Sequence, residues 1–137
     1  MEDDNFWNQH SVQFLEMAYT TDFRERIIAP DGYGARTGDC GDRVEFFVII
    51  NKGKLTHICF DVQGCVYTMA CCNTVIHLAQ GLKVEKAWEI SPDQVADFLE
   101  TLPEDHFHCA ELALGGFYLA LSDYENKRSG GRPGGSS

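Results

Sequence analysis

Apolar side chains recur at helical spacing in several stretches of the chain, and each such stretch predicts a helix with one buried face. The longest of these stretches are residues 5–20, 66–80, 91–100 and 107–126. Ser91 followed by Pro92 marks the start of the third helix, because serine caps a helix well and proline suits its first position. A shorter helix is predicted after the first one, with Thr20 or Thr21 as its cap and its end near Ile28.

The two-residue alternation of a β-strand appears in the middle of the chain. Residues 44–50 and 55–62 are rich in β-branched and aromatic side chains, and Lys52 and Gly53 between them form a turn signal. These segments predict an antiparallel hairpin. Glycine and proline punctuate residues 29–39, which therefore predict a loop. Helices, then strands, then helices indicate an α+β fold class.

Composition and charge narrow the possible roles. The 137 residues suit one domain, which we place at residues 1–128, and the glycine- and serine-rich residues 129–137 predict a disordered tail. A formal net charge of -10 argues against a nucleic-acid partner, because such binding needs basic side chains that displace counterions. No apolar run is long enough to span a membrane, and the first residues are acidic, unlike those of a leader peptide. We therefore expect a cytoplasmic protein with no membrane partner.

The chain has six cysteines, which stay reduced in the cytoplasm and serve there as metal ligands, reactive groups or packing residues. Three of them lie where the chain changes element: Cys40 before the first strand, Cys65 before a helix and Cys109 in the first turn of the last helix. With Asp42 or His108 as a fourth ligand, they would make a tetrahedral metal site. Their wide spacing leaves buried, inert cysteines as the alternative.

Short motifs around these cysteines follow one another in a defined order. They are Gly38-Asp-Cys-Gly-Asp42, then two strands, then Gly64-Cys65 opening a helix, and finally His108-Cys109-Ala110 opening the last helix. This order resembles the U-type iron–sulfur scaffold family, which comprises IscU and the N-terminal domain of NifU. The resemblance covers roughly residues 36–126. It implies an α+β fold with a small antiparallel sheet of about three strands packed against several helices.

The resemblance also implies a function. Members of this family are scaffolds rather than enzymes: they receive iron and persulfide sulfur, build a labile 2Fe–2S cluster and transfer it to apo acceptor proteins. Carried over residue by residue, the cluster ligands are Cys40, Asp42, Cys65 and Cys109, with His108 as an alternative metal ligand. A cysteine desulfurase supplies the sulfur, and Cys109 is the implied persulfide acceptor. Thiolates bind iron more strongly than a carboxylate does, so such a site holds a cluster and still releases it.

The chain departs from the family pattern in three segments. Arg-Ile-Ile-Ala-Pro at residues 26–30 stands where the family has a His-x-x-Asn-Pro-Arg-Asn-type segment. Val-Tyr-Thr at residues 66–68 stands where the family has small side chains. Leu-Pro-Glu-Asp-His at residues 102–106 replaces the Leu-Pro-Pro-x-Lys segment that a DnaK-type chaperone reads, so we expect such a chaperone to bind poorly. The same ligands also suit zinc, which makes a zinc-holding persulfide relay beside a desulfurase the alternative function. A module with inert cysteines is the third hypothesis.

The remaining candidate residues receive plainer interpretations. We expect Cys109 to be the most reactive thiol, because a helix N-terminus and the neighbouring His108 both stabilise a thiolate. His106 is interpreted first as a solvated loop residue and second as a hydrogen-bond donor to a ligand. Packing or surface positions are expected for five further residues. These are Cys59, Cys71, Cys72, His57 and His77.

Overall fold

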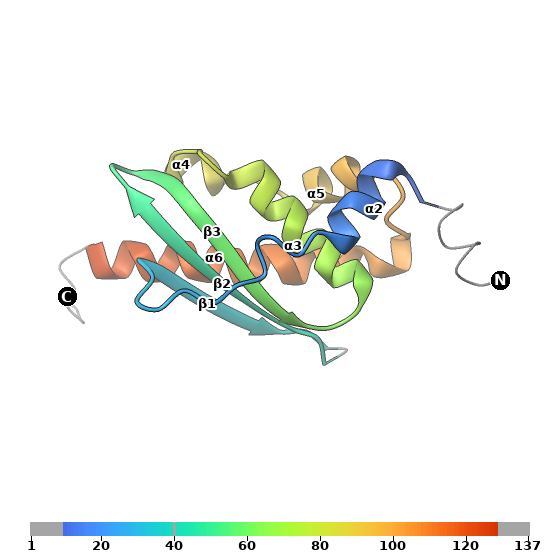
Figure 1. Ribbon diagram of the computed structural model, residues 1–137, viewed down its shortest axis with the longest axis horizontal. Coiled ribbons are helices and arrows are strands. Elements are labelled where there is room, and N and C mark those ends of the chain that lie inside the picture. Colours follow the sequence, from blue (N-terminus) through green and yellow to red (C-terminus); the bar gives the residue numbers. More distant parts are fainter. Residues whose placement is uncertain (1–9, 40, 129–137) are drawn as a thin grey trace.

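The computed structural model describes residues 10–39 and 41–128. Helices enclose one face of a small sheet, and the longest helix runs along the long axis of the molecule (Figure 1). In chain order the elements are α2 (Val12–Tyr19), β1 (Gly32–Thr37), β2 (Arg43–Asn51), β3 (Lys54–Gln63), α3 (Val66–Ala79), α4 (Val84–Ala87), α5 (Pro92–Leu99), the 3-10 helix η1 (Glu104–His106) and α6 (Phe107–Arg128).

The three strands form one antiparallel sheet in the order β1-β2-β3. Gly34 of β1 pairs with Phe46 of β2, which pairs in turn with Phe60 of β3. Both phenylalanines are fully buried because helices cover this face, with α6 packed on β1 and β2 and α3 on β3 (Figure 1). The predicted α+β class, with a small three-stranded antiparallel sheet packed against helices, is confirmed.

The prediction of a loop at residues 29–39 is wrong where β1 forms. A Cβ atom on Gly34 would lie 2.3 Å from the backbone nitrogen of Ala120 and 2.5 Å from the carbonyl oxygen of Gly116. The glycines of this segment therefore allow β1 to pack directly on the backbone of α6, and they do not mark a turn. Closely spaced glycines indicate either a turn or a close approach of two backbones, and only the packing partner distinguishes the two.

The short helix predicted to end near Ile28 is also wrong. Residues 22–23 instead form a turn, and the chain then runs beside β3, with an isolated parallel bridge between Arg24 and Phe60. The Phe60 N–H donates to the Phe23 carbonyl at 2.9 Å, and the Glu25 N–H donates to the Phe60 carbonyl at 2.9 Å. An unpaired strand edge offers such donors and acceptors, and this tertiary pairing outweighs a weak helix propensity.

The other predicted helices agree closely with the structure. Helices α3, α5 and α6 differ from the predicted ranges by only one or two residues at their ends, and Ser91 caps α5 as expected. The first predicted helix is described only as α2, where the Ser11 side chain accepts a hydrogen bond from the Phe14 N–H at 3.0 Å. Helices α4 and η1 were not predicted, because each is a single short turn.

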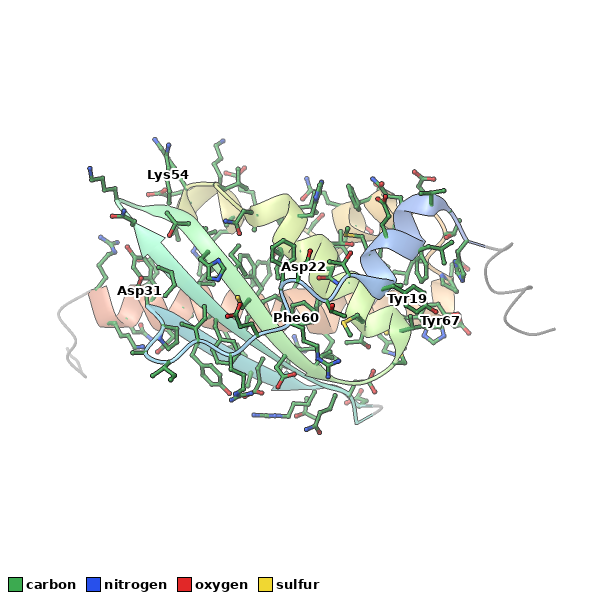
Figure 2. The ribbon with its side chains drawn as sticks, viewed as in Figure 1. Tyr19, Asp22, Asp31, Lys54, Phe60 and Tyr67 are labelled. Atoms are coloured by element: carbon green, nitrogen blue, oxygen red, sulfur yellow. The ribbon has the colours of Figure 1, made fainter. Side chains whose placement is uncertain are left out.

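The core lies between the sheet and helices α3, α5 and α6. Cys71 and Cys72 are fully buried in it, which confirms their interpretation as packing residues. Tyr67, in the first turn of α3, lies at the opposite end of the molecule from Lys54 in the β2–β3 hairpin (Figure 2). Among the described residues, no helix combines the length and apolar character that a membrane crossing requires. The predicted tail at 129–137 lies outside the described residues and stays a prediction.

Candidate functional site

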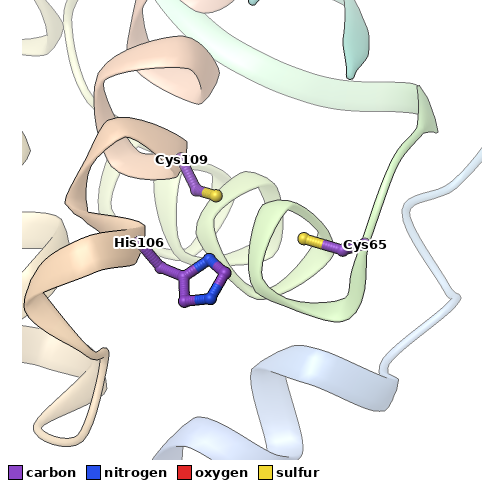
Figure 3. A group of neighbouring side chains, drawn as sticks. All are labelled: Cys65, His106 and Cys109. Atoms are coloured by element: carbon purple, nitrogen blue, oxygen red, sulfur yellow. The ribbon is translucent and has the colours of Figure 1, made fainter. Parts of the chain in front are cut away.

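Two cysteines and one histidine from separate elements meet beside the first turn of α3 (Figure 3). Cys65 is the N-cap of α3, Cys109 lies in the first turn of α6, and His106 ends η1 just before that helix. One ligand atom from each residue lies within 4.8 Å of the other two. Cys65 is exposed, Cys109 is buried and His106 is intermediate, so the cluster reaches the surface at Cys65.

Asp42 joins this cluster through Thr68. The Thr68 hydroxyl donates to Asp42 Oδ2 at 2.7 Å and lies 3.4 Å from Cys109 Sγ and 3.6 Å from Cys65 Sγ. The Cys65 N–H donates to the same carboxylate oxygen at 3.3 Å. A Cβ atom on Gly64 would lie 2.6 Å from that oxygen, so the glycine leaves the space that the carboxylate occupies. The structure thus gathers three of the sequence-predicted residues around one buried threonine.

The turn between β1 and β2 carries the fourth predicted ligand. The Gly38 N–H donates to the Asp42 carbonyl at 2.8 Å, and the Gly41 N–H donates to the Gly38 carbonyl at 3.0 Å. Gly41 has a φ of 93°, a conformation that glycine adopts without strain. These contacts hold Asp42 toward α3. Cys40 itself lies outside the described residues, so its place in the site stays a prediction.

The electrostatics of Cys109 differ from the expectation. Burial is the largest cause that raises the pKa of the Cys109 thiol to about 11, and the hydrogen bond from Thr68 opposes it. The prediction that the N-terminus of α6 stabilises the Cys109 thiolate, and so lowers this pKa, is therefore wrong. A cation bound to the sulfur would favour the thiolate, because its charge offsets the cost of burying the anion.

His106 is the residue whose role the sequence interpretation missed. Its ring stacks on Tyr67 with centroids 3.9 Å apart and an angle of 16° between the planes. Its Nδ1 is buried and has no hydrogen-bond partner among the described residues. His106 is therefore not a solvated loop residue. One feature of the sequence indicated this contact, because Tyr67 and His106 both belong to segments that depart from the family pattern. The structure places these two side chains in contact.

His108, the histidine predicted as a ligand, lies at the edge of this cluster. Its Nε2 is 3.7 Å from Cys109 Sγ. Its side chain also lines an open pocket with Arg36, Asp39 and Glu111. Within the described part of the chain, the group of mutually close ligand atoms contains His106 and not His108.

The donors gathered here define what the site can bind. Two thiols and an imidazole are ligands for zinc and for the iron of iron–sulfur clusters, and a nearby carboxylate adds a harder, weaker donor. The unpaired, buried Nδ1 of His106 fits such a cation, because a buried nitrogen without a partner is costly unless something binds to it. The residues present therefore suit a soft or borderline metal centre.

Comparison with known proteins finds matches in one family. A family model described as the NifU-like N-terminal domain matches residues 28–130. The iron-sulfur cluster assembly scaffold protein IscU 1 of Archaeoglobus fulgidus is 31% identical over 125 residues, which span 90% of this chain and 74% of that protein. The IscU scaffold protein of Buchnera aphidicola subsp. Acyrthosiphon pisum is 31% identical over 90 residues, or 65% of this chain and 70% of that protein.

One solved structure has a fold similar to that of this chain. The NifU-like protein (N-terminal) of Brucella abortus matches with a TM-score of 0.72 at 14% identity, over 93% of this chain and 99% of that one. At this identity the likeness shows a shared fold. The match of the family model shows that this chain belongs to the NifU-like N-terminal domain family of U-type iron–sulfur scaffolds.

Proposed function

We propose that this protein is a scaffold on which iron and persulfide sulfur are assembled into a labile iron–sulfur cluster that is then transferred to apo acceptor proteins. The observation that carries the proposal is the meeting of Cys65, His106 and Cys109 within 4.8 Å, with the exposed Cys65 at its rim. Membership of the U-type family supports it, as do the names of the relatives. The cluster is cargo of 2Fe–2S type, and the chain itself acts as a carrier rather than an enzyme.

The proposed ligands divide by strength. Cys40, Cys65 and Cys109 supply thiolates, which hold iron firmly, and Asp42 supplies the weaker donor that allows release. His106 and His108 are the proposed alternative ligands, and we favour His106 because one of its ring nitrogens lies within 4.8 Å of the sulfurs of both Cys65 and Cys109. The Thr68 hydroxyl donates a hydrogen bond to the Asp42 carboxylate at 2.7 Å. This contact holds the proposed weak ligand beside the site.

Sulfur delivery depends on whether the Cys109 thiol is protonated. The proposed donor is a cysteine desulfurase that carries a persulfide, and the Cys109 thiolate would attack its terminal sulfur while the desulfurase thiolate departs. Because burial raises the pKa of Cys109 to about 11, the thiol has to lose its proton before this attack. A cation held by Cys65 and His106 would favour that loss. We therefore expect sulfur transfer to Cys109 to follow metal binding.

The proposed partners follow from charge and from the segment before Cys109. A net charge of -10 suits a desulfurase and acceptors that present basic surfaces, and it makes a nucleic-acid partner unfavourable. Glu104 and Asp105 in η1 add negative charge where the family segment has none. We therefore propose that a DnaK-type chaperone binds this chain poorly.

Zinc is the alternative cargo, since two thiols and an imidazole also suit tetrahedral zinc. A chain that held zinc would serve as a persulfide relay for the desulfurase. Anaerobic purification followed by analysis of iron, acid-labile sulfide, zinc and the visible spectrum separates the two functions. Iron and sulfide in equal amounts support the scaffold, and stoichiometric zinc alone supports the relay. A protein that takes up no metal even after anaerobic reconstitution with iron and sulfide would overturn both.

A further inference from the structure

A second group of potential metal ligands lies on the outer face of the sheet, away from Cys65 and Cys109. Its members are Glu25, His57 and Cys59, and one ligand atom from each lies within 4.8 Å of the other two. His57 and Cys59 are two residues apart on β3, so their side chains point to the same face of the sheet. We propose that these three residues form a second metal site that takes Zn²⁺.

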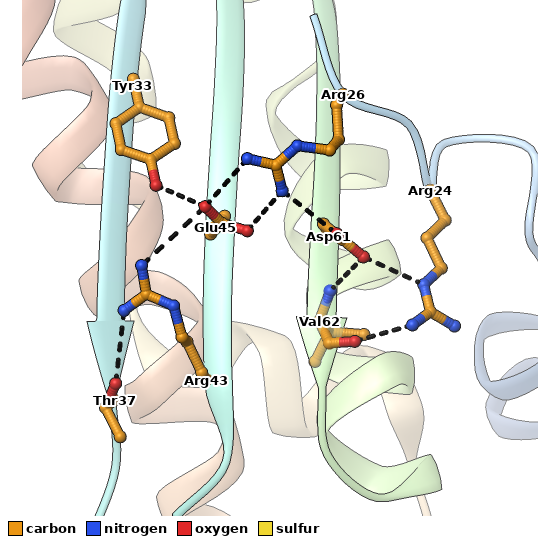
Figure 4. A network of polar contacts seen from close by, with 8 residues as sticks. All are labelled: Arg24, Arg26, Tyr33, Thr37, Arg43, Glu45, Asp61 and Val62. Atoms are coloured by element: carbon orange, nitrogen blue, oxygen red, sulfur yellow. Dashed lines mark hydrogen bonds and ion pairs between the residues drawn. The ribbon is translucent and has the colours of Figure 1, made fainter.

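The segment that carries Glu25 is held firmly beside β3, at the edge of the sheet. Its backbone pairs with Phe60 of β3 on both sides of Arg24. The neighbouring arginines anchor it further, because Arg24 contacts Asp61 at 3.3 Å and Arg26 contacts Glu45 at 2.6 Å (Figure 4). The backbone of Glu25 is thus positioned by contacts on either side of it, so only side-chain adjustments are needed to bind an ion.

The distances between the three side chains match those of a zinc site. Cys59 Sγ lies 3.2 Å from His57 Nε2 and 3.5 Å from Glu25 Oε1. Zinc binds sulfur at about 2.3 Å and nitrogen or oxygen at about 2.0–2.2 Å, so tetrahedral angles place two such ligand atoms roughly 3.5 Å apart. An ion can therefore sit among these atoms after small side-chain adjustments.

Exposure leaves room for a fourth ligand. Cys59 is buried beneath the two other side chains, whereas Glu25 and His57 are exposed. Water can then complete the coordination from the solvent side, as in zinc sites that have three protein ligands. Sequence reasoning assigned Cys59 to packing and His57 to the surface, and it missed Glu25 because nothing in the local sequence relates it to β3.

A plain hydrogen bond is the competing explanation for this group. Burial, followed by the hydrogen bond and charge of Glu25, raises the pKa of the Cys59 thiol to about 11, so Cys59 donates its proton toward Glu25. Binding of Zn²⁺ would form a bond to the sulfur and release that proton to solvent. A hydrogen bond to Glu25 alone does not require the imidazole of His57, which stands 3.2 Å from the same sulfur on its own strand.

Titration with Co²⁺ tests the proposal, because cobalt replaces zinc and its thiolate complexes absorb light. The full chain with Cys40→Ser, Cys65→Ser and Cys109→Ser lacks the thiols of the first site. We expect this variant to bind a single equivalent of Co²⁺ with a thiolate-to-cobalt absorption band, and Zn²⁺ to displace it. Adding His57→Gln should weaken binding on the order of a hundredfold, since even outer-shell changes cost roughly 10–100-fold.

Matched variants make the result decisive. His77→Gln is the control, because His77 is also exposed but packs against Phe98, with ring centroids 4.7 Å apart, and belongs to neither group of ligands. Cys59→Ala should abolish the absorption band. If the triple variant folds poorly, the wild-type chain should bind two equivalents of Co²⁺ and the His57→Gln chain one. Equal Co²⁺ binding by the parent, His57→Gln and Cys59→Ala chains would overturn the proposal, as would a cobalt spectrum without a thiolate band.

Discussion

Two buried thiols, Cys109 and Cys59, have the same raised pKa of about 11 but stand in different surroundings. Cys109 lies near a second thiol, a carboxylate and a stacked imidazole at the start of two helices. Within the described part of the chain, the group of ligands around Cys59 holds one imidazole and one carboxylate, on the outer face of the sheet. Burial raises both pKa values, so the pKa alone does not distinguish the two sites.

The difference lies in the ligands and in how the fold places them. The first site draws on helix starts, which bring the sulfurs of Cys65 and Cys109 together and leave Cys65 exposed for exchange. The second draws on a strand and a segment paired with it, which supply a single sulfur and two harder donors. Softer ligands favour iron–sulfur chemistry, whereas the mixed set favours a lone Zn²⁺. We expect the two sites to be chemically separable.

The largest expected effect comes from removal of the thiols of the first site. Cys65→Ser together with Cys109→Ser should abolish the binding of iron and acid-labile sulfide after anaerobic reconstitution, because hydroxyls are poor ligands for cluster iron. The visible spectrum and sulfide analysis measure this directly. Cys59→Ala is the matched control and should retain the cluster. Loss of the cluster from Cys59→Ala to the same extent would mean that the two sites are not independent.

The second prediction separates the two histidines beside Cys109. His106→Gln should weaken Co²⁺ binding at the first site on the order of ten- to a hundredfold, whereas His108→Gln should change it less, because only His106 lies in the group of mutually close ligand atoms. The affinities are measured in chains that also carry His57→Gln, so that the second site, on the outer face of the sheet, contributes little to Co²⁺ binding. A larger loss from His108→Gln would return His108 to the ligand set in place of His106.

A smaller effect is expected from the ring that supports His106. Tyr67→Leu should weaken Co²⁺ binding at the first site by a factor between about 2 and 10, because an aromatic stack contributes about 0.5–1.5 kcal/mol. Tyr67→Phe keeps the stack and should bind Co²⁺ like the wild-type chain. Equal losses in both variants would show that the hydroxyl matters and not the stacking.

The smallest effect concerns the ion pairs of Arg24 and Arg26, which help to hold the segment with Glu25 beside β3. The hydrogen bond from Arg26, followed by that from Tyr33, lowers the pKa of Glu45 (Figure 4). Because the folded-state pKa is lowered, the stabilisation is present above the unfolded pKa of about 4.3 and is lost as the pH falls through the folded value. Glu45→Gln should therefore lower the free energy of unfolding by about 1 kcal/mol at neutral pH.

Urea unfolding of both chains over a range of pH measures this linkage. The difference between wild type and Glu45→Gln should shrink as the pH is lowered below about 4, since the wild-type carboxyl is then protonated as well. A difference that stays constant down to pH 2 would contradict the assigned role of the Glu45 charge.

Much of the fold could be predicted because its patterns are local. The periodicity of α6, the capping box at Ser91 and the β2–β3 hairpin each depend on neighbouring residues. The misplaced segments depend on distant partners. β1 exists because its glycines fit against α6, and residues 23–25 pair with β3 because that strand offers a free edge.

The same distinction between local patterns and distant partners applies to the candidate sites. The sequence motifs indicate Asp42, Cys65 and Cys109, and the structure brings these residues together around Thr68, which no motif indicates. Glu25 could not be found from the sequence, because it becomes a neighbour of Cys59 only when its segment pairs with β3, whereas His57 lies two residues from Cys59 on the predicted strand. The spacing of residues thus indicates the sulfur ligands, and tertiary pairing supplies the rest.

Transfer of a preassembled cluster to an apo-ferredoxin tests the central claim most directly. The chain is reconstituted anaerobically with iron and sulfide, mixed with the apo-ferredoxin and followed by visible circular dichroism, with Asp42→Ala as the comparison. We predict that the holo-ferredoxin signal appears as this chain loses its iron and sulfide, and that Asp42→Ala keeps its cluster longer and transfers it more slowly, because the weak ligand is gone. A wild-type chain that binds no cluster, or that holds its cluster without any transfer to the ferredoxin, would contradict the account.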